Sequence, residues 1–405
     1  MAAQQESRST ALWLLPALAL YALLAWHFQF VQDDAYISYR YVANFLNGDG
    51  LVFNIGERVE GYTNHGWVIL LSLFGAVGID FIVVSRILGF LCGAGVVMLS
   101  WLMGRRIFAD GGKLLAVLPA YVTAATLSLA YWAPAGLETV AFALAAAASL
   151  CWYLTRSRLL VFGLAMAVWL RPEGALVALL LLIVEAVVER RAPLFSFGCG
   201  ALAFVLSLPM VGFKLSYYGS ILPNPFYAKT GWDTEQFISG LEYVGEFFGH
   251  YPIAAIGLLG GLVFYRRLES AARSVLLFVV FYLIYVALVG GDVLKVHRFL
   301  LPVVAPLGVL FALSLSKVLA GVGALRRMAI PTVVTVGLAA VVVTVLVPRE
   351  YVEGYNRSEK IFVRKMGMMA DAMKGSDSTS FSVAVATIGV FGYKLLGHDV
   401  MDRWG

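Results

Sequence analysis

Long apolar stretches separated by short polar segments recur along almost the whole chain. Most are roughly 16–22 residues long, the length at which a helix crosses the hydrocarbon core of a bilayer. The stretch at 158–170 is shorter, and we expect it to be a partial or broken helix. The pattern predicts an all-α polytopic membrane protein with eleven spans, at about 11–30, 82–103, 114–131, 137–154, 158–170, 174–188, 194–212, 251–265, 274–290, 299–316 and 328–347.

Arginine pairs interrupt this pattern and orient the predicted spans. Lys and Arg accumulate in the cytoplasmic loops of membrane proteins. Here they stand in short connections at Arg105 and Arg106, Arg190 and Arg191, Arg266 and Arg267, and Arg326 and Arg327, with a further cluster at Arg156 and Arg158. If all of these connections are cytoplasmic, the N-terminus is inside as well, and eleven spans satisfy the alternation.

This orientation gathers the polar residues on the outer side. The outer segments are about 31–81, 132–136, 171–173, 213–250 and 291–298, followed by a tail from residue 348. The apolar run 65–79 lies within the first of them. Counting this run as a span would put Arg105 and Arg106 outside, so we expect a juxtamembrane or re-entrant helix at the outer surface. Any chemistry is therefore expected outside.

Composition agrees with a membrane protein and narrows the classes of partner. Hydrophobic residues make up 60% of the chain and charged residues 14%, whereas a soluble domain carries about 25% charged residues. The net charge of +5 is explained by cytoplasmic Lys and Arg, so no nucleic acid partner is expected. The three cysteines lie inside apolar segments, which predicts neither a disulfide framework nor a zinc site built on them.

The segment Gln32-Asp33-Asp34-Ala35-Tyr36 lies where the first span leaves the bilayer. Carboxylates at a lipid boundary are costly and are functional candidates by default. Burial and a neighbouring like charge would raise one pKa towards a value suited to a general base. The alternative is that Asp34 caps the following helix while Asp33 marks the interface.

The rest of the first outer loop carries candidate sugar contacts. Tyr36, Arg40 and Asn44 share one face of a predicted amphipathic outer helix. A glycine-punctuated segment then follows from residue 50 to 64, which predicts a structured loop. Sugars are held by carboxylates, amides and aromatic faces, whereas Glu57 and Arg58 are interpreted as a surface pair. The candidate acceptor- or sugar-binding residues of this region are Tyr36, Arg40, Glu60, Tyr62, Asn64 and His65.

The segment DDAYISYRYVANFLNGDGLVFNIGERVEGYTN at 33–64 resembles the first outer loop of C-type membrane glycosyltransferases that use polyprenyl-phosphate sugars. Within that class it looks most like the bacterial arabinofuranosyltransferases of mycobacterial arabinan and of pilin glycosylation. The resemblance continues in order through GLETVAFAL at 136–144, LRPEG at 170–174, LPNPFYAKTG at 222–231 and GGDVLKVHRFLLP at 290–302. It therefore covers most of the chain and implies a C-type bundle with a large first outer loop.

The resemblance also implies residue roles. Asp33 or Asp34 would be the catalytic base. Cations near a span mouth would hold the donor phosphate, with snorkelling to lipid headgroups as the alternative; these are Lys229, Arg298 and His297, with Arg171 beside the pocket. Asp292 would orient Arg298 or Lys229, and the remaining sugar-side candidates are Glu138, Glu173, Asn224 and Tyr227. Two adjacent acids are compatible with a divalent cation but do not establish one.

The expected function is transfer of a sugar, arabinofuranose by resemblance, from a polyprenyl-phosphate donor to a glycan or protein acceptor such as pilin. The expected location is the periplasmic face of a bacterial inner membrane. A lipid flippase or transporter is one alternative, but transporters place ionisable residues near the midplane and repeat in halves. A polysaccharide polymerase or ligase is another, although such enzymes usually carry their large outer loop late in the chain.

The chain is expected to divide into a transmembrane module, 1–347, and an outer C-terminal segment, 348–405. The segment contains an amphipathic stretch near Ser358–Met373 and a β-like run at Phe381–Ala386, followed by no closing element. Such a piece cannot stand alone, so we expect a small α/β tail that docks on the outer loops. Relatives continue beyond a similar Gly-Val-Phe-Gly-Tyr segment, so the tail is expected to be incomplete.

Overall fold

Helices follow every apolar segment that the pattern singles out. The computed structural model describes residues 12–109, 112–224, 234–321, 329–376 and 381–402. The helices at the predicted spans are α2 (Leu14–His27), α5 (Phe81–Ile107), α6 (Lys113–Ala125), α7 (Leu127–Trp132), α8 (Thr139–Leu154), α9 (Leu160–Leu170), α10 (Gly174–Glu189), α11 (Leu194–Tyr218), α14 (Pro252–Val263), α15 (Ser270–Leu288), α16 (Leu301–Gly321) and α18 (Ala329–Leu346).

The lengths of these helices differ from the predicted spans. Five helices of the described chain are long and apolar enough to cross a membrane, or six if one bent pair is a single span. That pair joins α13 (Thr234–His250) to α14 at a bend of 106°, so the expected outer segment 213–250 contains a helix. The predicted span 114–131 is also divided, because Thr126 adopts an extended backbone (ψ 106°) between α6 and α7. Periodicity alone does not reveal such breaks.

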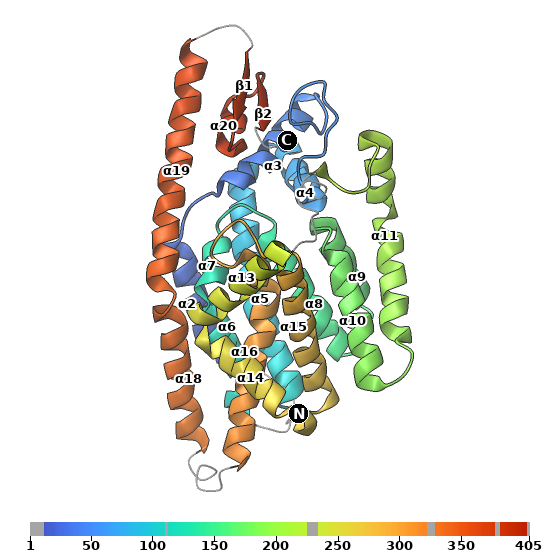
Figure 1. The fold of residues 1–405 in the computed structure, drawn as a ribbon, viewed down its shortest axis with the longest axis vertical. Coiled ribbons are helices and arrows are strands. Elements are labelled where there is room, and N and C mark those ends of the chain that lie inside the picture. Colours follow the sequence, from blue (N-terminus) through green and yellow to red (C-terminus); the bar gives the residue numbers. More distant parts are fainter. Residues whose placement is uncertain (1–11, 110–111, 225–233, 322–328, 377–380, 403–405) are drawn as a thin grey trace.

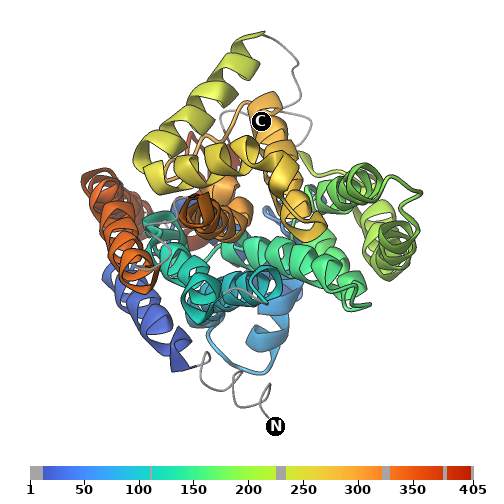
Figure 2. The same cartoon turned by 90° about the horizontal axis from the view of Figure 1, so that it is seen from below.

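The centre of the bundle is α16, which packs against α5, α6, α8 and α14. The apolar window of its span is 83% buried, against 28% for α11 and 22% for the span that begins in α18. Figure 2 shows the bundle end-on, with α18 and α11 at its periphery. The exposed helices carry apolar side chains outward, as lipid-facing helices do.

The polar elements gather at one end of the bundle. There lie α3 (Asp33–Asn47) and α4 (His65–Ala76), together with α20 (Gly389–Lys394) and the strands β1 (Ser382–Val385) and β2 (Asp399–Asp402) (Figure 1). The turn between α10 and α11, which holds Arg190 and Arg191, lies at the opposite end. This basic pair therefore lies away from the end where the polar elements gather.

The C-terminal segment forms a small β–α–β unit reached by a long helix, α19 (Arg349–Ser376). The strands β1 and β2 pair in parallel, with Ser382 opposite Asp399. Four buried residues, Ala370, Phe391, Leu395 and Val400, form the core between α19, α20 and the sheet. The predicted amphipathic helix and first strand agree with this arrangement. The expected lack of a closing element was wrong, because β2 completes the pair.

Arg40 fastens this unit to the first outer loop. The residue is 1% exposed. Its Nη2 donates hydrogen bonds to the His398 carbonyl (2.7 Å) and to Asn54 Oδ1 (3.1 Å), and its Nε donates to the Phe53 carbonyl (2.6 Å). A buried guanidinium needs such acceptors to offset the loss of hydration. The expected docking of the tail on the outer loops is confirmed by these bonds.

Candidate active site

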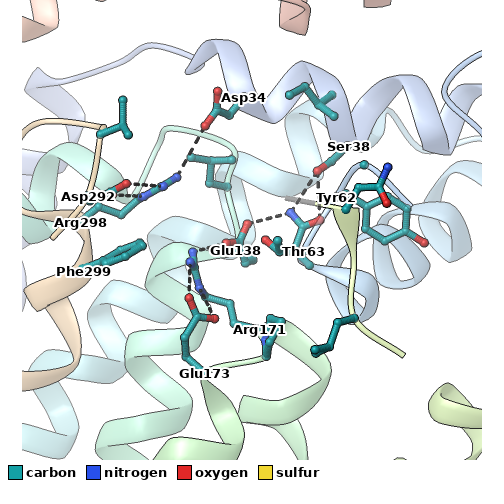
Figure 3. A pocket seen from close by; sticks show the side chains of 18 of the residues that line it. Asp34, Ser38, Tyr62, Thr63, Glu138, Arg171, Glu173, Asp292, Arg298 and Phe299 are labelled. Atoms are coloured by element: carbon teal, nitrogen blue, oxygen red, sulfur yellow. Dashed lines mark hydrogen bonds and ion pairs between the residues drawn. The ribbon is translucent and has the colours of Figure 1, made fainter. Parts of the chain in front are cut away.

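A cavity of about 1350 Å³ opens at the polar end of the bundle. Its wall is assembled from α3, the loop that follows it, the start of α8, the α9–α10 turn, α13, α15, the segment before α16 and the C-terminal strand β2. Helix starts and loops supply polar side chains because their backbone leaves the bundle there. Figure 3 shows the resulting cluster of acids and arginines.

The two adjacent aspartates point into different surroundings. Successive residues of a helix are rotated by about 100°, and Asp33 and Asp34 begin α3. The Asp34 side chain is 44% exposed and lines the cavity. The residue Asp33 is 6% exposed, lies outside the lining, and accepts hydrogen bonds from the backbone N–H groups of Gly389 (3.2 Å) and Val390 (2.9 Å).

The surroundings of Asp33 also affect its protonation. Burial raises the pKa of its carboxyl, the bond from Val390 opposes this rise, and the negative charge of Asp34 adds to it. The raised pKa of Asp33 agrees with the expectation that burial and a neighbouring like charge raise one pKa of the pair. The Asp33 oxygens accept hydrogen bonds from α20, and Asp33 is not among the residues that line the cavity, whereas Asp34 is.

Arg298 faces Asp34 across the cavity mouth. Its Nη1 lies 3.8 Å from Asp34 Oδ2, and its Nε and Nη2 donate to both oxygens of Asp292 at 2.6 and 2.9 Å. This fork-to-fork contact fixes the plane of the guanidinium. The expectation that Asp292 orients Arg298 agrees with this geometry.

A second cationic centre lies deeper in the wall. Arg171 donates from Nη1 to Glu138 (2.8 Å) and from Nε (3.3 Å) and Nη2 (3.0 Å) to the two carboxylate oxygens of Glu173. Burial opposes the charge of Arg171, but Glu173 and Glu138 outweigh it and raise the pKa of the guanidinium. Burial likewise opposes the charge of Glu173, and Arg171 outweighs it, so the pKa of Glu173 is lowered. The contact between Arg171 and Glu173 therefore favours the charged form of both groups.

Amide and hydroxyl groups extend this network along the cavity. Asn64 Nδ2 donates to Glu138 Oε2 (2.7 Å) and to Ser38 Oγ (3.0 Å). The ring centroid of Phe299 lies 5.2 Å from the Arg171 guanidinium carbon and 5.5 Å from that of Arg298, so it contacts both cations (Figure 3). The wall thus alternates charge, amide and aromatic surface, which suits a sugar phosphate.

The structure brings many of the predicted residues together. Those that line the cavity are Asp34, Tyr62, Asn64, Glu138, Arg171, Glu173, Asn224, Asp292 and Arg298. Lys229 and Tyr227 fall outside the described residues, so their roles stay predictions.

The other candidates lie outside the cavity lining. Tyr36 packs on Tyr393, with ring centroids 5.6 Å apart, and Arg40 holds the C-terminal unit. Glu60 forms a buried ion pair with Lys214 (2.8 Å). His65 Nδ1 lies 3.1 Å from the Tyr62 hydroxyl. His297 contacts His250 instead of the cavity.

Several lining residues escaped the sequence reasoning. They are Ser38, Thr63, Gln236, Ser239, Tyr285, Lys295 and Phe299. Ser38 could have been predicted from the sequence, because it stands four residues after Asp34 and therefore lies on the same face of the helix. Gln236 and Ser239 had none, because the helix that carries them was taken for a loop.

Comparison with proteins of known sequence gives a consistent family. The chain is 31% identical over 300 residues to a terminal β-(1→2)-arabinofuranosyltransferase of Mycobacterium tuberculosis, and 28% identical over 334 residues to the protein of the same name in Corynebacterium glutamicum. These matches cover 66% and 69% of this chain but 46% and 47% of the relatives, so the chain spans about half their length. No protein-family model matches the chain.

Solved structures identify the architecture. ArnT from Cupriavidus metallidurans superimposes with a TM-score of 0.66 at 14% identity, over 99% of this chain and 86% of that one. The chain has the C-type membrane glycosyltransferase fold. The oligosaccharyltransferase AglB from Archaeoglobus fulgidus agrees, with a TM-score of 0.62 at 14% identity over 97% of this chain and 64% of that one.

These matches confirm the resemblance read from the sequence. The chain is similar in sequence to the arabinofuranosyltransferases, has the C-type fold, and is a multi-pass membrane protein. ArnT has also been solved with undecaprenyl phosphate, and that structure superimposes with a TM-score of 0.65 at 13% identity over 97% of this chain and 85% of that one. The AglB structure holds an inhibitory peptide and a dolichol-phosphate.

Proposed function

We propose that this chain transfers arabinofuranose from a polyprenyl-phosphate donor to a glycan or protein acceptor on the periplasmic face of a bacterial inner membrane. The observation that carries the proposal is the half-exposed Asp34 carboxylate, which faces a cavity walled by Arg298 and Arg171. The sugar is proposed because both curated relatives are named arabinofuranosyltransferases. The donor lipid is proposed because ArnT and AglB have been solved with polyprenyl phosphates.

In the proposed reaction, Asp34 removes the proton from an acceptor hydroxyl as that oxygen attacks the anomeric carbon of the donor. The bond between the anomeric carbon and the phosphate oxygen breaks, and its electron pair leaves with polyprenyl phosphate. The products are the glycosylated acceptor, polyprenyl phosphate and a protonated Asp34, so charge and atoms balance. General-base assistance of this kind contributes typically about 10²–10⁴-fold.

Arg298 is proposed to hold the departing phosphate. Its guanidinium lies near enough to Asp34 that one ligand can touch both groups, and Asp292 keeps its plane fixed. Positive charge at the leaving oxygen stabilises the transition state more than the ground state. Lys295 also lines the cavity. Lys229 is proposed, from the sequence, to bind the same phosphate.

The Arg171 centre is proposed to hold the acceptor or the sugar ring. Glu138 and Glu173 share the single positive charge of Arg171, and their remaining lone pairs serve as hydrogen-bond acceptors for sugar hydroxyls. Tyr62, Asn64 and Asn224 add an aromatic face and amides along the same wall. A flippase fits less well, because these charges lie beside α3 and the α9–α10 turn, at the polar end of the bundle.

The decisive experiment uses the purified chain in nanodiscs with a panel of synthetic polyprenyl-phosphate sugars. We expect the arabinofuranose donor to be consumed and polyprenyl phosphate to be released. Asp34→Asn should abolish release, whereas Asp49→Asn, which changes an exposed acid of the same outer region, should retain it. Consumption of no donor, or wild-type release by Asp34→Asn, would overturn the proposal.

A further inference from the structure

Two histidines and a glutamate converge behind the cavity wall. Glu246 and His250 lie on α13, and His297 lies in the turn before α16. Within the described part of the chain this is the one group of three metal-ligating side chains whose donor atoms lie within 4.8 Å of one another. None of the three lines the cavity, so the cluster is separate from the Asp34 site.

The two histidine nitrogens lie about 0.5 Å closer together than in a tetrahedral metal site. His250 Nδ1 lies 2.9 Å from His297 Nε2, whereas two nitrogens bound to one zinc ion at about 2.0–2.1 Å lie about 3.4 Å apart. A small rotation of either ring supplies the difference. Glu246 and His250 are four residues apart on one helix, so both side chains project from the same face.

The types of donor select the class of metal. Two imidazole nitrogens and one carboxylate suit zinc, nickel or cobalt, whereas magnesium and calcium require oxygen ligands. Three protein donors leave one tetrahedral position for water. The ring of Tyr351 covers the group from α19, with its centroid 4.1 Å from that of His250.

We propose that Glu246, His250 and His297 bind a divalent transition metal of the zinc class, which ties α13 to the turn that carries Arg298. The backbone of this turn is strained and needs contacts that hold it in place. Val296 and His297 both have left-handed backbones, at φ 60° and 55°, and a β-branched residue rarely adopts that conformation. Strain of this kind persists only where the surroundings hold it.

The metal site also links the cavity to the C-terminal helix. The backbone N–H of Val296 donates to the Tyr351 hydroxyl (3.1 Å), and Tyr351 also hydrogen-bonds Glu246. Metal bound at this point therefore joins α13, α19 and the Arg298 turn. Its role is positional, because the ion is separated from the reacting groups by the turn itself.

The test measures metal content and therefore does not depend on transferase activity. The full chain is purified in detergent, stripped with a chelator, reconstituted with Co²⁺ or Zn²⁺ and desalted. We expect about one equivalent of bound metal by mass spectrometry and the visible absorption of tetrahedral cobalt. His250→Gln and Glu246→Gln should lose both signals. His27→Gln, which removes an exposed histidine elsewhere, should keep them.

Folding is checked separately, by monodispersity on size exclusion and by thermal melting with and without zinc. Zinc should raise the melting temperature of the wild type and of His27→Gln but not of His250→Gln. A wild type that retains no metal after reconstitution would overturn the proposal. So would a folded His250→Gln protein that binds metal like the wild type, or a site that Mg²⁺ occupies equally well.

Discussion

Asp33 Oδ1 accepts a hydrogen bond of 2.9 Å from the backbone N–H of Val390, which is 357 residues further along the chain. The second carboxylate oxygen accepts another from Gly389. Asp34, the next residue, turns instead towards Arg298 in the cavity. Two neighbouring acids thus have separate tasks, one in anchoring the C-terminal unit and one in the proposed chemistry.

Replacement of Asp34 by Asn should reduce sugar transfer about 10²–10⁴-fold, because an amide does not accept the acceptor proton. Donor affinity should change little. The measurements are release of polyprenyl phosphate for turnover and binding of a labelled donor for affinity. A loss of donor binding as large as the loss of turnover would assign Asp34 to binding instead of proton transfer.

Gly389→Ala should loosen the C-terminal unit without altering any ionisable group. A Cβ at residue 389 would overlap the backbone oxygen and carboxyl of Asp33, so α20 has to move away from α3. Hydrogen bonds to a charged group stabilise by about 1.5–3 kcal/mol each, and the variant forfeits both. Limited proteolysis should cleave the C-terminal unit faster than in the wild type.

A matched control is Gly354→Ala, since a Cβ there meets no atom within 4 Å. It should leave the rate of cleavage unchanged. Equal cleavage of Gly389→Ala and the wild type would show that Asp33 does not anchor the unit.

Arg298→Lys should weaken donor binding by about tenfold, which corresponds to about 1.4 kcal/mol. Lysine keeps the charge but cannot form the two parallel bonds to Asp292 that fix the guanidinium. Arg349→Lys, at an exposed arginine, is the control and should bind donor normally. The comparison is an equilibrium titration with polyprenyl-phosphate sugar, and unchanged affinity would return Arg298 to a purely structural role.

The ion pair between Arg171 and Glu173 should make stability depend on acidity. The pKa of Glu173 is lowered in the folded chain, so its contribution is fully present above the unfolded pKa of about 4.3. It is lost as pH falls through the lower folded value. The difference in melting temperature between the wild type and Glu173→Gln should therefore be constant near neutral pH and vanish in acid. A difference that grows below pH 4 would contradict the direction of the shift.

The sequence alone predicted those candidate site residues that stand directly beside a predicted span. The acids at the end of the first apolar stretch, the Arg-Pro-Glu turn and the Asp292–Arg298 segment were all found from their place beside predicted spans. They meet in one cavity because helix ends on one side of a bundle converge. Asp292 and Arg298 are six residues apart, close enough that their pairing was foreseeable.

Long-range partners were not foreseeable in this way. Arg40 looked like a sugar contact because nothing nearby in sequence reveals that its acceptors are the carbonyls around residue 398. The role of Asp33 in holding the C-terminal unit was not predicted either, because its partners Gly389 and Val390 are far away in sequence. The strand at residues 399–402 has the pattern Asp-Val-Met-Asp, which is too short and too polar to predict without its partner. Helix α13 was missed because glycines and charges interrupt it.

The clamp that Arg40 forms has a consequence for how the protein is made. The first outer loop is made long before the C-terminal unit, so Arg40 reaches its acceptors at Gly392, Leu395 and His398 only when those residues have been synthesised. Until then Asp33 lacks the amides of α20, and the cavity wall lacks β2. A chain interrupted before residue 389 would therefore lack both the anchor of Asp33 and the part of the cavity wall that β2 supplies.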